Sequence, residues 1–241
     1  MKQQPTEGNM AYMQEAEVIT YLEGLLSRNL DWPEARERDQ MAAVVSCMDG
    51  RLTRFLRPFS HVIRTAGAVA EPVEGSIGIA SGLTSVTLLA THGDCLAYRQ
   101  ALQYLADSHA GRTADSHLVT NLNRSDTRAL LTYINMQRPL GALPSPNDQK
   151  ALAELAISYA VQWSTANTGD KPRIGLFIDL AAALASEPQV WVVSYNQHAG
   201  PQLGRFLHAR GMSPPVISAH VFAEELGKSY RSTTTSAIMW L

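Results

Sequence analysis

Two short stretches of this 241-residue chain carry the side chains best suited to chemistry. The first places Cys47, Asp49 and Arg51 at every second position, directly after an apolar run. The second places His92 and Cys95 three residues apart, again after an apolar run. Thiolate and imidazole are the ligands that borderline-soft Zn²⁺ prefers. The two stretches together predict a zinc site.

Each apolar run has the length and composition of a buried strand, and the two runs span 41–45 and 86–90. Alternate side chains of an extended segment point the same way, so we expect the three polar side chains of the first stretch to leave its strand on one side. A spacing of three on the first turn of a helix would put His92 and Cys95 on one face. Two parallel strand ends could then deliver Cys47, His92 and Cys95 to one ion and leave its fourth position open, as in catalytic zinc sites.

The chain contains only two cysteines, Cys47 and Cys95. A disulfide or a pair of buried free thiols is the ordinary alternative to a metal site. Because both cysteines belong to the zinc constellation, and because the expected compartment is reducing, we favour zinc.

Composition and charge are those of an ordinary globular protein, with 45% hydrophobic and 17% charged residues. A net charge of −2 argues against a broad nucleic-acid-binding surface, which would need clustered Lys and Arg. The first ten residues are polar and lack the pattern of a secretory signal, and no apolar run approaches the roughly 18 residues of a membrane-spanning helix. We therefore expect a cytoplasmic protein with no membrane or nucleic-acid partner.

Predicted helices alternate with predicted strands along the chain. This alternation predicts an α/β fold with a mostly parallel central β-sheet flanked by helices. We expect three parts: an N-terminal helical arm (1–40), a zinc-binding α/β domain (41–195) and a C-terminal extension (196–241). The amphipathic segment 11–30 would pack across the domain or on a second subunit. The extension would pack on the same domain or on a neighbouring subunit.

The spacing of apolar residues and the residues that flank each run place the expected elements on the sequence. Helices are expected at 52–59, 74–83, 96–105, 125–137 and 148–163. Strands are expected at 41–45, 61–63, 86–90, 173–178 and 190–193. Ser125 is predicted to cap the fourth helix.

Three segments closely resemble the signature segments of the β-class carbonic anhydrases. They are Cys47-Met48-Asp49-Gly50-Arg51, Arg64-Thr65-Ala66-Gly67-Ala68 and His92-Gly93-Asp94-Cys95. The segment 173–180 is similar to that family's next strand, and the resemblance covers roughly two-thirds of the chain, over 41–194. The chain departs from the family at Thr65, where Asn is usual, and at Leu96, where Gly is usual.

The resemblance implies a zinc lyase, a carbonate dehydratase that hydrates CO₂ reversibly to bicarbonate by attack of zinc-bound hydroxide. It implies Cys47, His92 and Cys95 as metal ligands, and a homodimer or higher homo-oligomer. Two thiolates and one neutral imidazole cancel the charge of Zn²⁺, so a bound water is acidified less than at a three-imidazole site. Asp49, held ionised by Arg51, could compensate by accepting a hydrogen bond from that water, or could instead close the fourth position. These two residues are the expected catalytic residues.

Two other functions are compatible with the same residues. Hydrolases of carbonyl sulfide or carbon disulfide resemble β-carbonic anhydrases in all three motifs. The departure from the family at Leu96 is compatible with that chemistry. A catalytically silent, zinc-stabilised assembly protein is the other alternative, although a structural zinc needs no pair such as Asp49 and Arg51. Arg64 is expected to hold the site from behind or to pair across a subunit boundary. Asp94 is expected to be a helix-start or supporting residue rather than a ligand.

Overall fold

A computed structural model describes residues 42–56, 59, 61–84, 86–112, 124–137, 143–166, 171–180, 189–196 and 198. The predicted helical arm (1–40) lies outside these residues, and so does the predicted extension (196–241) except for Asn196 and His198. The division into three parts therefore stays a prediction. None of the described helices is long and apolar enough to cross a membrane.

A five-stranded sheet forms the centre of the described structure, in the order β2-β1-β3-β4-β5. The strands are β1 (Ala42–Cys47), β2 (His61–Thr65), β3 (Val86–His92), β4 (Arg173–Asp179) and β5 (Gln189–Tyr195). The first four run parallel to one another, and β5 pairs antiparallel with β4. The predicted α/β fold with a mostly parallel sheet is confirmed, and a strand lies at each of the five expected places.

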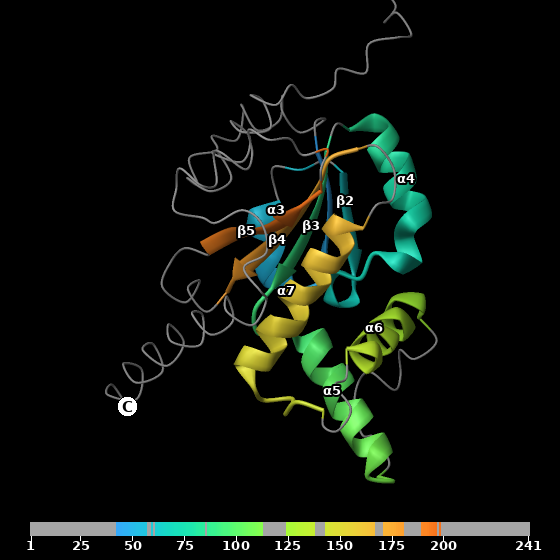
Figure 1. Ribbon diagram of the computed structural model, residues 1–241, viewed down its shortest axis with the longest axis vertical. Coiled ribbons are helices and arrows are strands. Elements are labelled where there is room, and N and C mark those ends of the chain that lie inside the picture. The colour runs from blue at the N-terminus through green and yellow to red at the C-terminus, as the bar shows by residue number, and fades with distance from the viewer. Residues whose placement is uncertain are drawn as a thin grey trace, which may run out of the picture.

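Helices flank this sheet, and the turns beside its strands are short 3₁₀ segments. The α-helices are α3 (Thr53–Leu56), α4 (Glu74–Leu83), α5 (Leu96–His109), α6 (Ser125–Met136) and α7 (Gln149–Thr165). The 3₁₀ segments are η2 (Gly50–Leu52), η3 (Ala66–Ala68) and η4 (Glu71–Val73). Helix α7 contacts β3, β4 and β5, whereas α5 and α6 pack together beyond the carboxyl ends of the strands (Figure 1).

The helix predictions are confirmed in place, with two differences. The first expected helix (52–59) is shorter, because the chain forms η2 and then only the single turn α3. Ser125 is the first residue of α6, and the N-cap is Arg124, whose side chain makes no capping bond. The prediction that Ser125 caps this helix was therefore wrong. Asp148, in contrast, caps α7 by accepting a hydrogen bond from the backbone N–H of Ala151 at 3.1 Å.

The two central strands, β1 and β3, consist entirely of buried residues. Their sequences, AAVVSC and VTLLATH, are continuous runs rather than alternating ones, as expected of parallel strands covered on both faces. They pair in register from Ala42 with Val86 to Ser46 with Ala90. The ends of both strands therefore reach the same edge of the sheet.

Helix α7 lies very close to the sheet at Gly175 on β4. A Cβ atom added there would lie 2.8 Å from the backbone oxygen of Ala160 in α7 and 2.6 Å from Ser194 Oγ on β5. Real Cβ atoms do not come this close to backbone atoms, so glycine is required for the helix to sit at this distance.

Gly175→Ala should lower the free energy of unfolding by about 1–3 kcal/mol, because the added methyl group overpacks the contact between α7 and the sheet. Gly78→Ala in α4 is the matched control, since a Cβ there would meet nothing within 4 Å. The control should raise stability by about 0.5–1 kcal/mol, because Ala favours a helix more than Gly does. Urea denaturation measures both values, and equal stabilities would contradict the close packing of α7.

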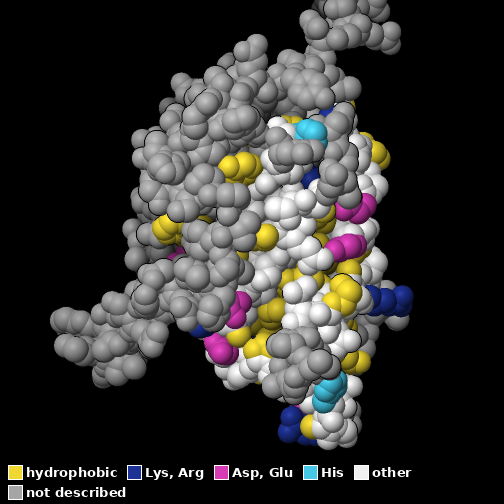
Figure 2. Space-filling view, viewed as in Figure 1, with side chains coloured by type: hydrophobic (Ala, Val, Ile, Leu, Met, Phe, Trp, Pro, Cys, Tyr) yellow, Lys and Arg dark blue, Asp and Glu magenta, His cyan; other side chains and the backbone are white. Residues whose placement is uncertain are grey.

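Hydrophobic side chains also reach the surface, as the yellow areas on the face in Figure 2 show. The large exposed ones among the described residues are Met48, Ile79, Leu83, Leu96 and Met136. Single exposed apolar residues are common on protein surfaces. Met48 and Leu96, however, both line a cavity near the carboxyl ends of β1 and β3. That cavity therefore has an apolar wall.

Candidate metal centre

Cys47, His92 and Cys95 come together at the carboxyl ends of β1 and β3. All three are buried, and one ligand atom from each lies within 4.8 Å of the other two. The two Sγ atoms are 3.7 Å apart. Tetrahedral zinc with Zn–S bonds of about 2.3 Å places two sulfurs about 3.8 Å apart. The spacing fits zinc and is much longer than the S–S bond of about 2.05 Å that the disulfide alternative requires.

The imidazole of His92 is oriented as a metal ligand would be. Its Nδ1 lies 2.7 Å from the carbonyl oxygen of Gly93, which can only accept, so Nδ1 carries the proton. The lone pair is then on Nε2, which is buried and has no hydrogen-bond partner within the described part of the chain. A metal ion would satisfy a buried lone pair of this kind beside two thiols. The donor set therefore fits Zn²⁺.

His92 and Cys95 meet through a turn and not, as predicted, on one helix. His92 is the last residue of β3, whereas Cys95 is the N-cap of α5. The bend between them contains Asp94, which has a φ of +50°. Asp is one of the few residues that adopt this left-handed conformation at modest cost. The predicted shared helix face was wrong, although the two side chains do converge.

The two thiols hold one proton between them. The Cys95 thiol donates a hydrogen bond to Cys47 and, against the effect of burial, lowers the pKa of Cys47 to about 4. The same bond, together with burial, raises the pKa of Cys95 well above its ordinary value. The backbone N–H groups of Ala97 and Tyr98 favour the Cys95 thiolate, as expected at a helix start, but they are outweighed. Binding of a metal would displace the shared proton.

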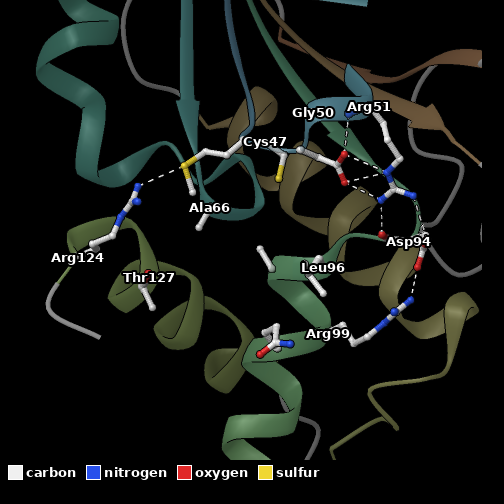
Figure 3. A pocket seen from close by; sticks show the side chains of 13 residues that line it. Cys47, Gly50, Arg51, Ala66, Asp94, Leu96, Arg99, Arg124 and Thr127 are labelled. Carbon is white, nitrogen blue, oxygen red and sulfur yellow. Dashed lines mark hydrogen bonds and ion pairs between the residues drawn. The ribbon is translucent and has the colours of Figure 1, made fainter. Parts of the chain in front are cut away.

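Asp49 and Arg51 form a forked ion pair beside this group (Figure 3). Arg51 Nε donates to Asp49 Oδ1 at 3.0 Å and to Oδ2 at 3.1 Å, and Nη2 donates to Oδ2 at 2.6 Å. Burial alone would raise the pKa of Asp49, but the hydrogen bonds from the side chain and backbone N–H of Arg51 bring it below its ordinary value. The carboxylate is therefore ionised at neutral pH.

This ion pair is built on a 3₁₀ turn and not on an extended strand. Strand β1 ends at Cys47, Asp49 is the N-cap of η2, and Arg51 lies within η2. The expectation that all three side chains leave one extended segment on the same side was therefore wrong. Asp49 nevertheless faces the ligand group, because its Oδ2 lies 3.9 Å from His92 Nε2.

Arg64 supports the site from behind, which is one of the two roles expected from the sequence. Its Nε donates to the carbonyl oxygen of Cys47 at 3.3 Å, and its Nη2 donates to the carbonyl oxygen of Asp49 at 2.8 Å. Thr65, next to it, is buried, and its Oγ1 donates to the carbonyl oxygen of Val69 at 2.8 Å. The Thr65 hydroxyl, at the position where the resembling family usually has the side-chain amide of Asn, therefore bonds within its own turn and not to the ligand group.

Three tyrosines pack behind the metal centre. Tyr98 and Tyr133 meet edge to face at 6.4 Å between ring centroids, and Tyr133 and Tyr159 do so at 4.8 Å. Gly67, with a φ of +67°, lies against Tyr98 and Leu130, since an added Cβ would be 3.1 Å from the Tyr98 ring and 3.0 Å from the Leu130 side chain. The turn after β2 therefore packs on side chains of α5 and α6.

Sequence reasoning missed the other partners of Arg51. Its Nη1 donates to Asp94 Oδ2 at 3.1 Å, and its Nη2 donates to the carbonyl oxygen of Asp94 at 2.9 Å. Asp94 Oδ1 in turn accepts from Arg99 Nη2 and, at 3.1 Å, from Gln149 Nε2. Asp94 is therefore a supporting residue and not the helix cap, which is Cys95. No spacing rule links Arg99 or Gln149 to the site, so the sequence held no signal for them.

A cavity of about 620 Å³ opens beside the ligand group (Figure 3). Part of its wall is apolar and includes Ala66, Leu96 and Ala97. Gln100 and Arg124 supply polar groups to the same wall. A small neutral molecule could lie against the apolar part while a charged product meets the polar part.

Cys47→Ser and His92→Ala should each reduce bound zinc to near zero, because each removes one of three ligands whose spacing fits the ion. His109→Ala is the matched control, since His109 is exposed at the end of α5. The control should keep one zinc per chain. Elemental analysis of the purified proteins measures the content, and full zinc in either ligand variant would contradict the site.

No protein-family model matches this chain, and no curated protein matches it in sequence. Solved structures do match it. A carbonic anhydrase from Glaciozyma antarctica is 20% identical, and the match covers 67% of this chain and 90% of that chain, with a TM-score of 0.33. One of two tetrameric β-carbonic anhydrases from Sordaria macrospora is 13% identical, and the match covers 71% of this chain and 91% of that chain, with a TM-score of 0.38.

A third match is β-carbonic anhydrase isoform I from Trichomonas vaginalis. It is 15% identical, and the match covers 74% of this chain and 97% of that chain, with a TM-score of 0.35. The two β-class matches name the family that the three motif segments resemble. Because all these identities and TM-scores are low, the function is inferred below from the residues of the site and their geometry.

Proposed function

We propose that this protein is a carbonic anhydrase that catalyses the reversible hydration of CO₂ to bicarbonate with one zinc ion per chain. The observation that carries the proposal is the buried group Cys47, His92 and Cys95 beside a carboxylate, Asp49, that Arg51 holds ionised. Structural zinc sites are closed by four protein ligands, whereas three ligands leave one position for chemistry. Among the described residues, three candidate ligands lie together.

The residues of the site have separate tasks in this reaction. The two sulfurs and His92 Nε2 would hold Zn²⁺, which would supply a nucleophile by acidifying water. Asp49 Oδ2, 3.9 Å from His92 Nε2, can accept a hydrogen bond from a water beside the ligand group and orient it. Arg51 keeps this carboxylate unprotonated, so that it accepts and does not donate.

The lining of the cavity suits both the substrate, CO₂, and the product, bicarbonate. CO₂ carries no charge and needs only a small apolar surface, which Ala66, Leu96 and Ala97 provide. Bicarbonate is an anion, and Arg124 provides a cation on the same wall. The homo-oligomeric state and the cytoplasmic location expected from the sequence stay predictions.

Stopped-flow measurement of CO₂ hydration tests the proposal, with protein of confirmed zinc content at a pH near 7 and again near 9. We expect rapid turnover that rises with pH, because the nucleophile forms by loss of a proton from water. A fully zinc-loaded protein without turnover at either pH would overturn the proposed function.

Arg51→Ala should keep zinc and lower the rate about ten- to a hundredfold, the effect of losing strong hydrogen bonds to a charged group. Zinc is kept because the side chain of Arg51 bonds to Asp49 and Asp94 and not to a predicted ligand side chain. Arg112→Ala is the matched control, since Arg112 also pairs with an aspartate, Asp107, but at the far end of α5. Its rate should equal that of the wild type. An unchanged rate in the Arg51 variant would contradict the role of the ion pair.

Hydrolysis of carbonyl sulfide or carbon disulfide is the second candidate. The observation in its favour is Leu96, which is 57% exposed and lines the cavity directly after Cys95. Its side chain adds apolar surface where the resembling family usually has none. A sulfide-release assay with both substrates separates the candidates, because brisk CO₂ hydration without sulfide release would exclude this one.

A further inference from the structure

We propose that Asp94 is a positioning residue, which anchors Arg51 and thereby keeps the Asp49 carboxylate from closing the metal position. This inference deepens the proposed function and rests on it for its effect on rate. Its physical basis is a row of alternating charges, Asp49, Arg51, Asp94 and Arg99, in which each member bonds to the next.

Arg51 is held from two sides. Its Nε bonds only to Asp49 and its Nη1 only to Asp94 among the described residues, while its Nη2 bonds to both. The side chain is 47% exposed, so it would otherwise keep much of its rotational freedom. A long exposed side chain held by one partner loses entropy for little gain. The second partner makes the forked geometry toward Asp49 persistent.

Asp94 is a rigid anchor because two helices hold it in place. Arg99 of α5 and Gln149 at the start of α7 both donate to its Oδ1, which leaves Oδ2 for Arg51. Figure 3 shows Asp94 between Arg51 and Arg99, with its carboxylate directed to both. Its left-handed backbone, with a φ of +50°, fixes the direction of this side chain. Any movement of Arg51 therefore strains contacts with η2, α5 and α7 together.

This anchor matters because Asp49 is close to the ligand group. Asp49 Oδ2 lies 3.9 Å from His92 Nε2, and a carboxylate oxygen is a good zinc ligand. A modest rotation of Asp49 would let it occupy the position that the substrate water needs. If Arg51 could follow this rotation, the forked pair would not oppose it. Because Asp94 fixes Arg51, Asp49 can reach the metal position only by breaking the fork.

The test is a double-mutant cycle with zinc affinity as its readout. Zinc dissociation constants are measured by chelator competition for the wild type, Asp94→Asn, Asp49→Asn and the double variant. Asn keeps the backbone carbonyl acceptor and tolerates the left-handed conformation. Asp94→Asn should bind zinc about fivefold more tightly, the net size of one ordinary hydrogen bond, because Asp49 is freer to act as a fourth ligand. In the Asp49→Asn background, Asp94→Asn should leave the zinc dissociation constant unchanged.

The sign of the effect separates positioning from general damage, since loss of a merely structural residue near a metal weakens binding. Asp107→Asn is the matched control, because Asp107, on α5, is also paired with an arginine, Arg112, and the zinc affinity of this variant should stay at the wild-type value. Weaker or unchanged zinc binding in Asp94→Asn, or the same change in both backgrounds, would overturn the anchoring role.

Rate measurements on the same proteins distinguish failure of this inference from failure of the proposed function. Asp94→Asn should lower kcat/KM for CO₂ hydration by the factor by which zinc binding tightens, because a smaller fraction of the free enzyme is open. Brisk wild-type turnover without the expected coupling would overturn the anchoring role alone. The expected coupling in a wild type that does not hydrate CO₂ would support the anchor and overturn the proposed reaction.

Discussion

The parallel, in-register pairing of β1 with β3 is the constraint on which the rest of this structure depends. It runs from Ala42 with Val86 to Ser46 with Ala90, and so brings Cys47 and His92 to the same edge of the sheet. A slip of one residue would move a ligand by about 3.3 Å and turn it to the other face. Because both strands are buried throughout, such a slip would also disturb the core on both faces. The stability of the sheet therefore sets how precisely the three candidate ligands are placed.

Around this edge, polar groups are tied to several elements at once. Arg64 on β2 holds the backbone between β1 and η2, and Asp94 connects η2 with α5 and α7. Arg51, Asp94 and Arg99 each have an opposite charge beside them, and Arg64 donates to carbonyl oxygens, so the cost of removing these charges from water is offset. Side chains held in this way need little reorganisation during a reaction, which is the general requirement for a preorganised site.

The two departures from the resembling family have different structural consequences. Thr65 is buried and satisfied within its own turn, so it leaves the ligand group undisturbed. Leu96 is exposed and stands on the cavity wall, next to Cys95. The geometry of Cys47, His92 and Cys95 thus stays compatible with zinc, whereas Leu96 changes the shape of the cavity beside them. We therefore expect Leu96, more than the candidate ligands, to determine which substrate binds.

The sequence by itself determined the strands, the helices and the candidate ligand residues, because continuous apolar runs can only be buried and parallel strand ends meet at one edge. It also determined Asp49 and Arg51 as a pair, since they are two residues apart. The tertiary structure alone decided how these residues meet: through the left-handed turn at Asp94 and the 3₁₀ turn after Cys47. It alone decided that Arg99 and Gln149 converge on Asp94, and that the Sγ atoms of Cys47 and Cys95 lie within hydrogen-bonding distance. The physical reason is that backbone turns and bonds between distant segments depend on how the helices pack, which no local spacing records.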